Sequence, residues 1–303
     1  NWDFSNTLCT TILFYNNNNN IPKIHGDLSG WTLPNTLTNF YSYYVSGITS
    51  LPLDYSNTLL SSLQIYYAHT NQDISDFIFG THIYYISFYN CTTLTGNIET
   101  YTIPPSVQYF IMSICSLRGD FSLITFNSLI RYLSLDNNLL TGNIVGMTFP
   151  GSLDTINLSY NSGITVNFNA GEFHTNKIIT LQLNGISGVT GNFSNFIFDE
   201  NMYNLSINNT PINCDLSNLN PEKVSSLSLY DCSGLYGDLT NWLTGTTILT
   251  GLYIYDNPLL SGDTTNWVIN NIENLFVENT DLTGNLKHNN VYCKDKDLNS
   301  PQF

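Results

Sequence analysis

Side chains that could act as acids, bases, nucleophiles or metal ligands are scattered in this 303-residue chain. The histidines show none of the spacings that metal sites use. No H-E-x-x-H, G-x-S-x-G, phosphate-loop or C-x-x-C pattern is present. The five histidines are His25, His69, His82, His174 and His288. We therefore expect a protein that is no enzyme and that holds no metal and no cofactor.

Acidic residues recur directly after glycine, at Asp27, Asp120, Asp238 and Asp263. Such a column of oxygen atoms offers calcium ligands, but its spacing is not that of a known calcium repeat. An aspartate in a turn also accepts hydrogen bonds from the backbone N–H groups that follow it. We therefore expect these carboxylates to cap turns.

Tyrosine is the residue type whose spacing indicates recognition, and the chain contains 20 of them. A tyrosine offers an apolar ring and a polar hydroxyl and loses little entropy when it is fixed, which suits the binding of sugar or peptide. Tyrosine is also common in exposed strands for purely structural reasons, so both interpretations stay open. The candidate ligand-binding residues are Tyr15, Tyr43, Tyr66, Tyr89, Tyr85, Tyr109 and Tyr132. Tyr41, Tyr44 and Tyr67 are expected to enlarge the same patch.

A repeated apolar pattern would position these tyrosines. An apolar residue is followed by others three and five positions later and by a ladder residue at the eighth, as in Ile130, Leu133, Leu135 and Asn138. Such spacing predicts a short strand with alternate side chains pointing inward. The twelve matches, about 24 residues apart, begin at Cys9, Leu37, Leu60, Ile83, Val107, Ile130, Leu153, Ile178, Met202, Val224, Leu249 and Ile272. The chain is therefore expected to stack about twelve rungs, each burying its apolar face on its neighbours.

A second motif follows most ladder residues: an apolar residue, any residue, glycine, aspartate or asparagine, and usually another apolar residue. It occurs at residues 94–98 (LTGNI) and 140–144 (LTGNI). Together the two motifs resemble the leucine-rich repeat, with the L-x-G-x-I segment of plant-type and some bacterial extracellular proteins. The resemblance covers residues 1–286, which begin within a repeat, and residues 287–303 are expected to form a polar cap or tail.

The resemblance implies a leucine-rich-repeat solenoid with a parallel β-sheet on its concave face. Short strands, turns and 3-10 segments are expected on the other faces. In this family the inward ladder asparagine bonds to backbone groups of the turn, and the glycine permits a tight turn. The family is associated with binding surfaces more than with any single activity, so the fold alone leaves the function open.

The charge of the chain excludes some partners. Eight Lys and Arg residues stand against 23 Asp and Glu, a formal net charge of -15. Such a surface repels nucleic acid and anionic membranes. No apolar run reaches the length that spans a bilayer. The first residue is Asn1 rather than Met, which leaves two alternatives: a signal peptide that has been removed, or a sequence that is a fragment. The polar, tyrosine-rich composition favours an extracellular or cell-surface location.

Five sequons for N-linked glycosylation are present, a number that chance alone would produce. Asn157, Asn204 and Asn208 are expected on the exposed strand face, where a glycan would cover the middle of the concave surface. The candidate sites are Asn90, Asn157, Asn192, Asn204 and Asn208.

The cysteines offer two kinds of bridge. Cys91 and Cys115 occupy the same ladder position in adjacent rungs, so their Cα atoms are expected about 5 Å apart, within disulfide reach. Buried free thiols are the equal alternative. Cys9 and Cys293 lie at opposite ends of the stack, so we expect each to be free or bonded to another molecule.

Two functions fit these observations. The main prediction is an extracellular structural glycoprotein whose copies stack end to end into a fibre or surface layer, because the array begins within a repeat and has cysteines at both ends. The alternative is a ligand-recognition ectodomain or adhesin that binds a glycan or peptide on its tyrosine-rich concave face.

Overall fold

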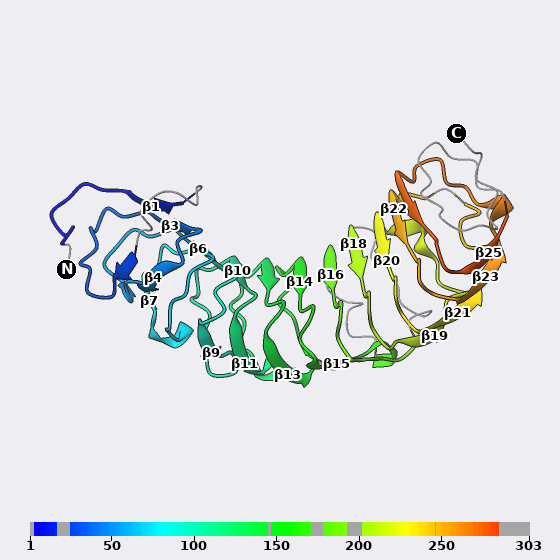
Figure 1. The fold of residues 1–303 in the computed structure, drawn as a ribbon, viewed down its shortest axis with the longest axis horizontal. Helices are drawn as coiled ribbons and strands as arrows, with labels where there is room; N and C mark the ends of the chain where they lie inside the picture. The colour runs from blue at the N-terminus through cyan, green and yellow to red at the C-terminus, as the bar shows by residue number, and fades with distance from the viewer. Residues whose placement is uncertain are drawn as a thin grey trace. The chain divides into compact units, whose positions relative to one another are not determined.

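The computed structural model describes residues 3–16, 25–144, 147–170, 178–192, 202–245 and 247–284. The chain divides into two units, and each is built from the same stacked rungs (Figure 1). Unit 1 comprises Asn1–Gly142 and Phe149–Leu153, and unit 2 comprises Asn143–Thr148 and Asp154–Phe303. The predicted tail at 287–303 lies outside the described residues.

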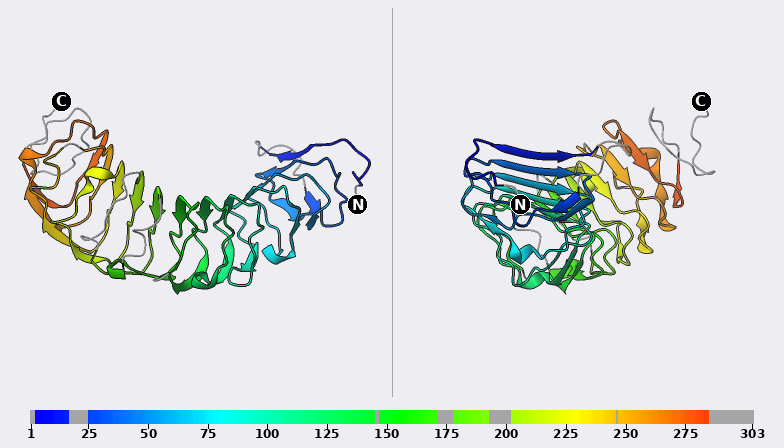
Figure 2. Two further views of the ribbon diagram at one scale, coloured as in Figure 1. Left: turned by 180° about the vertical axis from the view of Figure 1, so that it is seen from behind. Right: turned by 60° about the vertical axis from the view of Figure 1, so that its left-hand side comes forward.

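Six parallel strands form the main sheet of unit 1 and pair in chain order. The first of them, in blue, lie side by side in the right-hand view of Figure 2. Their register follows the apolar pattern, since Phe40 lies opposite Leu63 and Leu63 lies opposite Ile86. The strands are β1 (Thr11–Tyr15), β3 (Asn39–Tyr43), β6 (Ser62–Tyr66), β8 (Tyr85–Tyr89), β10 (Tyr109–Ser113) and β12 (Tyr132–Ser134).

Unit 2 contains six further main strands, each three residues long and again paired in parallel with the next one along the chain. They are β14 (Thr155–Asn157), β16 (Thr180–Gln182), β18 (Asn204–Ser206), β20 (Ser226–Ser228), β22 (Gly251–Tyr253) and β24 (Asn274–Phe276). The twelve main strands correspond to the twelve rungs that the sequence predicts, which confirms the expected solenoid.

Shorter strands and 3-10 helices follow the main strands, as the resemblance implies. The strands are β2 (His25–Asp27), β4 (Gly47–Ser50), β5 (Asp54–Tyr55), β7 (Ile78–Phe79), β9 (Thr95–Asn97), β11 (Ser116–Asp120), β13 (Leu139–Asn143), β15 (Gly163–Asn167), β17 (Gly188–Thr190), β19 (Asn213–Asp215), β21 (Gly234–Asp238), β23 (Leu259–Asp263) and β25 (Asp281–Thr283). The 3-10 helices are η1 (Ile74–Asp76), η2 (Phe121–Leu123), η3 (Phe168–Ala170), η5 (Pro221–Lys223) and η6 (Thr264–Asn266). Many of these strands contain the glycine motif of the sequence.

The core of each unit is a column of inward side chains from the main strands. Phe40, Leu63, Ile86 and Phe110 are completely buried in unit 1, and Leu181 and its equivalents are buried in unit 2. Because alternate residues of a strand point to opposite faces, the residues between them face outward. Stacking therefore buries what no rung could bury alone.

The ladder asparagines bond across rungs, as expected. Asn257 Nδ2 donates to the carbonyl oxygens of Leu229 and Ile254, both at 2.8 Å, and its Oδ1 accepts from the N–H of Cys232 at 3.0 Å. In unit 1, Asn138 Nδ2 donates to the equivalent carbonyl oxygens of Met112 and Leu135, and its Oδ1 accepts from the N–H of Leu117 at 3.0 Å. These bonds satisfy backbone groups that turn inward, away from water.

The residue before each ladder position has a left-handed backbone, a feature that the sequence did not reveal. Tyr44, Tyr67 and Asn90 have φ values of 60°, 60° and 53°, and equivalent residues continue the column in both units. Non-glycine residues rarely adopt this conformation. The strand therefore ends at a sharp turn, which brings the ladder side chain inward beneath the sheet.

The carboxylates after the glycines cap turns, which confirms that expectation. Asp238 Oδ1 accepts from the N–H of Thr240 at 2.9 Å, and the Thr240 hydroxyl and backbone both lower the pKa of this carboxyl. Equivalent bonds occur at Asp27, Asp120 and Asp263. The glycine of the next rung packs against this turn: a Cβ at Gly262, whose φ is +134°, would lie 2.7 Å from Asp238 Oδ1.

A Gly262→Ala variant is expected to lower the free energy of unfolding by about 1–3 kcal/mol, because the new methyl group meets the turn of Asp238 and the backbone is strained at positive φ. Urea denaturation of the full chain measures this loss. Gly151→Ala is the control, since a Cβ there has no neighbour within 4 Å. A loss at Gly262 no larger than at Gly151 would contradict the predicted close packing.

Candidate functional site

The first column of predicted tyrosines lies along four neighbouring strands of unit 1. Tyr15 of β1 lies opposite Tyr43 of β3, which lies opposite Tyr66 of β6, which lies opposite Tyr89 of β8. The successive ring centroids are 6.5, 5.0 and 5.9 Å apart. The period-two spacing of the strands therefore aligns these rings as the sequence predicts.

The second column lies toward the start of the strands. Tyr85 of β8, Tyr109 of β10 and Tyr132 of β12 are successive backbone partners, with ring centroids 5.6 and 6.2 Å apart. Burial and its interaction with the Tyr66 side chain raise the pKa of Tyr85 to about 12. Tyr66 and Tyr85 therefore join the two columns into one surface.

Three further tyrosines widen this surface. Tyr41 stacks on Tyr43 with their centroids 5.9 Å apart. Tyr44 and Tyr67, both in the left-handed turn positions, stack at 4.7 Å, and the ring of Tyr67 lies 5.7 Å from that of Tyr89. We call the whole set the tyrosine patch: Tyr15, Tyr41, Tyr43, Tyr44, Tyr66, Tyr67, Tyr85, Tyr89, Tyr109 and Tyr132.

Hydrogen bonds hold several of these rings in place. The Tyr43 hydroxyl donates to Gln64 Oε1 at 2.9 Å, and the Tyr41 hydroxyl donates to Asn39 Oδ1 at 2.9 Å. Gln64 faces outward between the columns, and nothing in its spacing distinguished it in the sequence. Burial, with smaller contributions from Tyr66 and Tyr41, raises the pKa of Tyr43 to about 12. The phenol of Tyr43 is therefore neutral at physiological pH.

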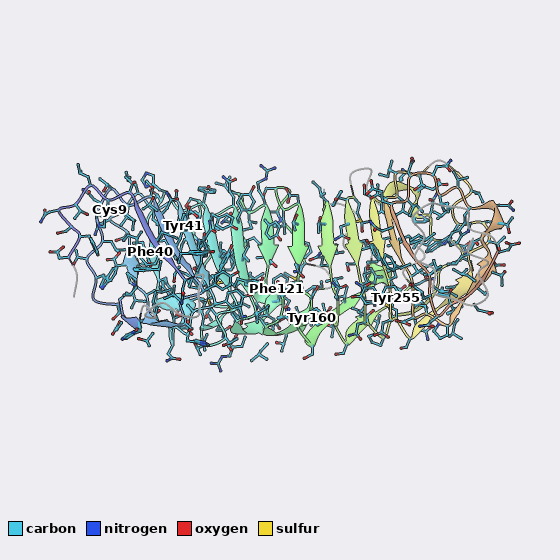
Figure 3. The ribbon with its side chains drawn as sticks, turned by 45° about the horizontal axis from the view of Figure 1, so that its top comes forward. Cys9, Phe40, Tyr41, Phe121, Tyr160 and Tyr255 are labelled. Atoms are coloured by element: carbon cyan, nitrogen blue, oxygen red, sulfur yellow. The ribbon has the colours of Figure 1, made fainter. Side chains whose placement is uncertain are left out.

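The tyrosine patch combines fixed rings with accessible edges. Tyr15 is 55% exposed and Tyr44 is 51% exposed, whereas Tyr43 and Tyr66 are half-buried. In Figure 3, Tyr41 lies beside the blue strands of unit 1. A row of ordered rings and hydroxyls can stack on sugar rings or on apolar peptide side chains and also exchange hydrogen bonds with them.

The structure corrects the expected position of one sequon. Asn208 was expected on the exposed face, but its side chain is only 4% exposed. Its Oδ1 accepts from the Ser228 hydroxyl at 2.9 Å, and its Nδ2 donates to Ser206 Oγ at 2.9 Å. A glycan on Nδ2 would break this network, because neighbouring rungs have closed over a polar side chain of modest size.

The other four sequons stay predictions. Asn192 is exposed, whereas Asn90, Asn157 and Asn204 are half-buried. Asn90 occupies the turn position that follows Tyr44 and Tyr67 along the stack, so its side chain lies at the border of the tyrosine patch.

The cysteines lie in two environments. Cys91 and Cys115 are free, buried thiols in the structure, and burial raises the pKa of both, that of Cys91 to about 11. A disulfide between them stays a prediction. Cys9 is half-buried and also a free thiol, whereas Cys293 lies outside the described residues.

The described residues include no group of three or more His, Cys, Asp or Glu side chains placed to hold a metal ion. No helix within the described ranges is long and apolar enough to cross a membrane.

Comparisons with known proteins identify the fold. No family model and no curated protein matches the chain. Among solved structures, the Arabidopsis receptor kinase HAESA, in complex with the peptide hormone IDA and the co-receptor SERK1, matches with a TM-score of 0.54 at 16% identity, over 86% of this chain and 50% of that one. The plant peptide hormone receptor RGFR1, in complex with RGF2, matches with a TM-score of 0.50 at 16% identity, over 86% of this chain and 52% of that one.

The chain thus spans about half the length of these receptors. Their likeness agrees with three features of the chain itself: the repeated apolar pattern, the parallel main strands in each unit and the cross-rung ladder asparagines. This protein has the leucine-rich-repeat fold.

Proposed function

We propose that the chain is an extracellular recognition module that binds an extended peptide or glycan along the tyrosine patch. The observation that carries this proposal is the gathering of ten tyrosines over consecutive strands of unit 1, with ring contacts between neighbours along each column. An elongated ligand that crosses the strands would meet a ring at every rung.

The chemistry of the patch suits a neutral, hydrogen-bonding ligand. The pKa of Tyr43 and of Tyr85 is raised to about 12, so these phenols stay protonated and can both donate and accept hydrogen bonds at physiological pH. Several rings are already held by neighbours, so little entropy remains to be lost on binding.

The structural neighbours favour ligand recognition over the end-to-end fibre, which is the main prediction from the sequence. Two of them are receptors solved in complexes, one with RGF2 and one with the peptide hormone IDA. The same proposal includes an extracellular location and a role in binding rather than in catalysis. End-to-end stacking stays a prediction of the sequence, and light scattering on a concentrated sample measures it.

A variant carrying both Tyr66→Ala and Tyr89→Ala is expected to bind at least about thirtyfold more weakly, because truncation of a central aromatic anchor costs about 2 kcal/mol or more. Tyr66 contacts Tyr43 and Tyr89, so the change opens the middle of the patch. Arrays of immobilised oligosaccharides and peptides identify a ligand for the native chain, and titration of that ligand compares the variants.

Tyr203→Ala is the matched control, because Tyr203 is 62% exposed, belongs to unit 2 and is not part of the tyrosine patch. Circular dichroism establishes that each variant is folded. If no array ligand binds the native chain, or if the double variant binds as tightly as Tyr203→Ala, the proposed role of the patch is wrong.

A further inference from the structure

A second aromatic surface lies in unit 2 and borders a groove. The groove has a volume of about 500 Å³ and is lined by Tyr253, Tyr255, Asp256, Phe276, Glu278 and Asn279. These residues belong to strands β22 and β24 and to the turns that follow them. In Figure 3, Tyr255 lies near the yellow and orange strands of unit 2.

Two stacked aromatic pairs supply the aromatic rings that line this groove, those of Tyr253, Tyr255 and Phe276. The rings of Tyr253 and Phe276 have centroids 5.2 Å apart at 14°, and those of Tyr230 and Tyr255 have centroids 4.5 Å apart at 8°. Tyr255 and Phe276 bring the two pairs together at 6.3 Å. Aromatic faces carry negative potential, so such walls attract a cation.

The groove also carries two carboxylates. Asp256 Oδ1 accepts a hydrogen bond from Asn279 Nδ2. Glu278 Oε2 is buried, and no described group donates a hydrogen bond to it. The side chains of Asp256 and Glu278 both line the groove, so two acidic groups lie beside its aromatic rings.

Besides burial, both carboxylates contribute to the raised pKa of the neighbouring Tyr255. Burial raises the pKa of Tyr255 to about 12, with further contributions from Tyr230, Asp256 and Glu278. Tyr255 is therefore neutral at physiological pH, and the negative charge near the groove belongs to the two carboxylates. A ligand that met these two carboxylates would have to donate hydrogen bonds, and a positive charge would favour its entry.

We propose that this groove binds the guanidinium group of an arginine side chain presented by a peptide. A guanidinium group is planar, so it can stack on the rings of Tyr255 or Phe276, and its N–H groups can donate to Glu278. The groove is separate from the tyrosine patch, shares no residue with it and can bind whether or not the patch does.

The test compares two peptides on the intact chain: acetyl-Gly-Arg-Gly-amide and the same peptide with citrulline, which keeps the shape of arginine but is uncharged. Isothermal titration calorimetry is expected to show at least about tenfold tighter binding of the arginine peptide, since hydrogen bonds between charged groups are the stronger ones. Raising the salt concentration should weaken that binding.

Glu278→Gln removes one of the two carboxylate charges of the groove with little change in size and is expected to weaken arginine-peptide binding at least about tenfold. Its matched control is Glu273→Gln, an exposed glutamate of the same rung that does not line the groove. Phe276→Leu keeps both carboxylates and is expected to weaken binding through the loss of the stacked ring. Thermal unfolding followed by circular dichroism establishes that each variant is folded.

The proposal is overturned by no measurable binding of the arginine peptide, by equal binding of the citrulline peptide, or by equal losses in Glu278→Gln and Glu273→Gln. Displacement of the arginine peptide by methyl glucoside as effective as by free arginine methyl ester would assign the groove to a sugar instead and would also overturn it. The double variant of Tyr66 and Tyr89 is expected to keep full arginine-peptide binding. Failure of this groove and failure of the tyrosine patch are therefore distinguishable.

Discussion

Asn257→Leu is expected to lower the free energy of unfolding by about 3 kcal/mol or more, since three buried backbone groups lose their partner together. These groups are the carbonyls of Leu229 and Ile254 and the N–H of Cys232. Leucine has a similar size but offers no donor or acceptor, so these backbone groups would stay buried without a hydrogen-bond partner. Urea denaturation followed by tryptophan fluorescence measures the loss, because Trp242 and Trp267 are buried in the same unit.

Asn274→Leu is the matched control for this prediction. Asn274 lies one rung further along, on the exposed side of β24, and its replacement is expected to change stability by no more than about 0.5 kcal/mol. Equal effects of the two substitutions would show that the ladder asparagine has no special role in the stack. Hydrogen exchange should locate the loss of protection at the rungs of Leu229 and Asn257, since repeat stability depends on nearest neighbours.

Phe40→Ala is expected to lower the free energy of unfolding by about 3–5 kcal/mol, because it leaves a cavity in a fully buried part of unit 1. The ring of Phe40 lies 6.0 Å from that of Phe14 and 6.1 Å from that of Tyr55. Phe14 belongs to the preceding rung and Tyr55 to the rung of Phe40 itself, so the cavity weakens packing both between rungs and within one. Urea denaturation and hydrogen exchange measure the size and the place of the loss.

Tyr41→Ala is the internal control for that change, because the two residues are adjacent on β3 and point to opposite faces of the sheet. Tyr41 is half-exposed, and its loss removes one stack on Tyr43 and one hydrogen bond to Asn39. The expected destabilisation is less than half that of Phe40→Ala. A Tyr41 variant as unstable as the Phe40 variant would mean that the outward face contributes as much as the core.

Some features of the candidate site could be predicted from the sequence and others could not. The columns of Tyr66 and Tyr85 could be predicted, because period two and the constant rung length fix which residues share a face. The contact between these two columns could not be predicted, since it depends on which way each ring turns from its strand. The stack of Tyr44 on Tyr67 could not be predicted either. It depends on a left-handed backbone at both residues, and the sequence does not indicate this conformation at a residue other than glycine.

The error at Asn208 has a similar cause. Its strand position was read correctly as outward, yet Ser206 and Ser228 bond to its side chain and neighbouring rungs cover it. Exposure on this face depends on the size and pairing of side chains one rung away. The residue pattern within one rung therefore does not predict how exposed its outward side chains are.

By itself the sequence determined the solenoid: its rung length, its inward residues such as Phe40, its ladder asparagines such as Asn257 and its turn-capping aspartates. These features follow from local spacing, because each rung repeats the same backbone path and stacks on an equivalent neighbour. Only the tertiary structure decided which outward side chains touch across rungs. It joined the tyrosines of unit 1 into one surface and placed Glu278 beside stacked rings in unit 2, because such contacts arise between residues a full rung apart.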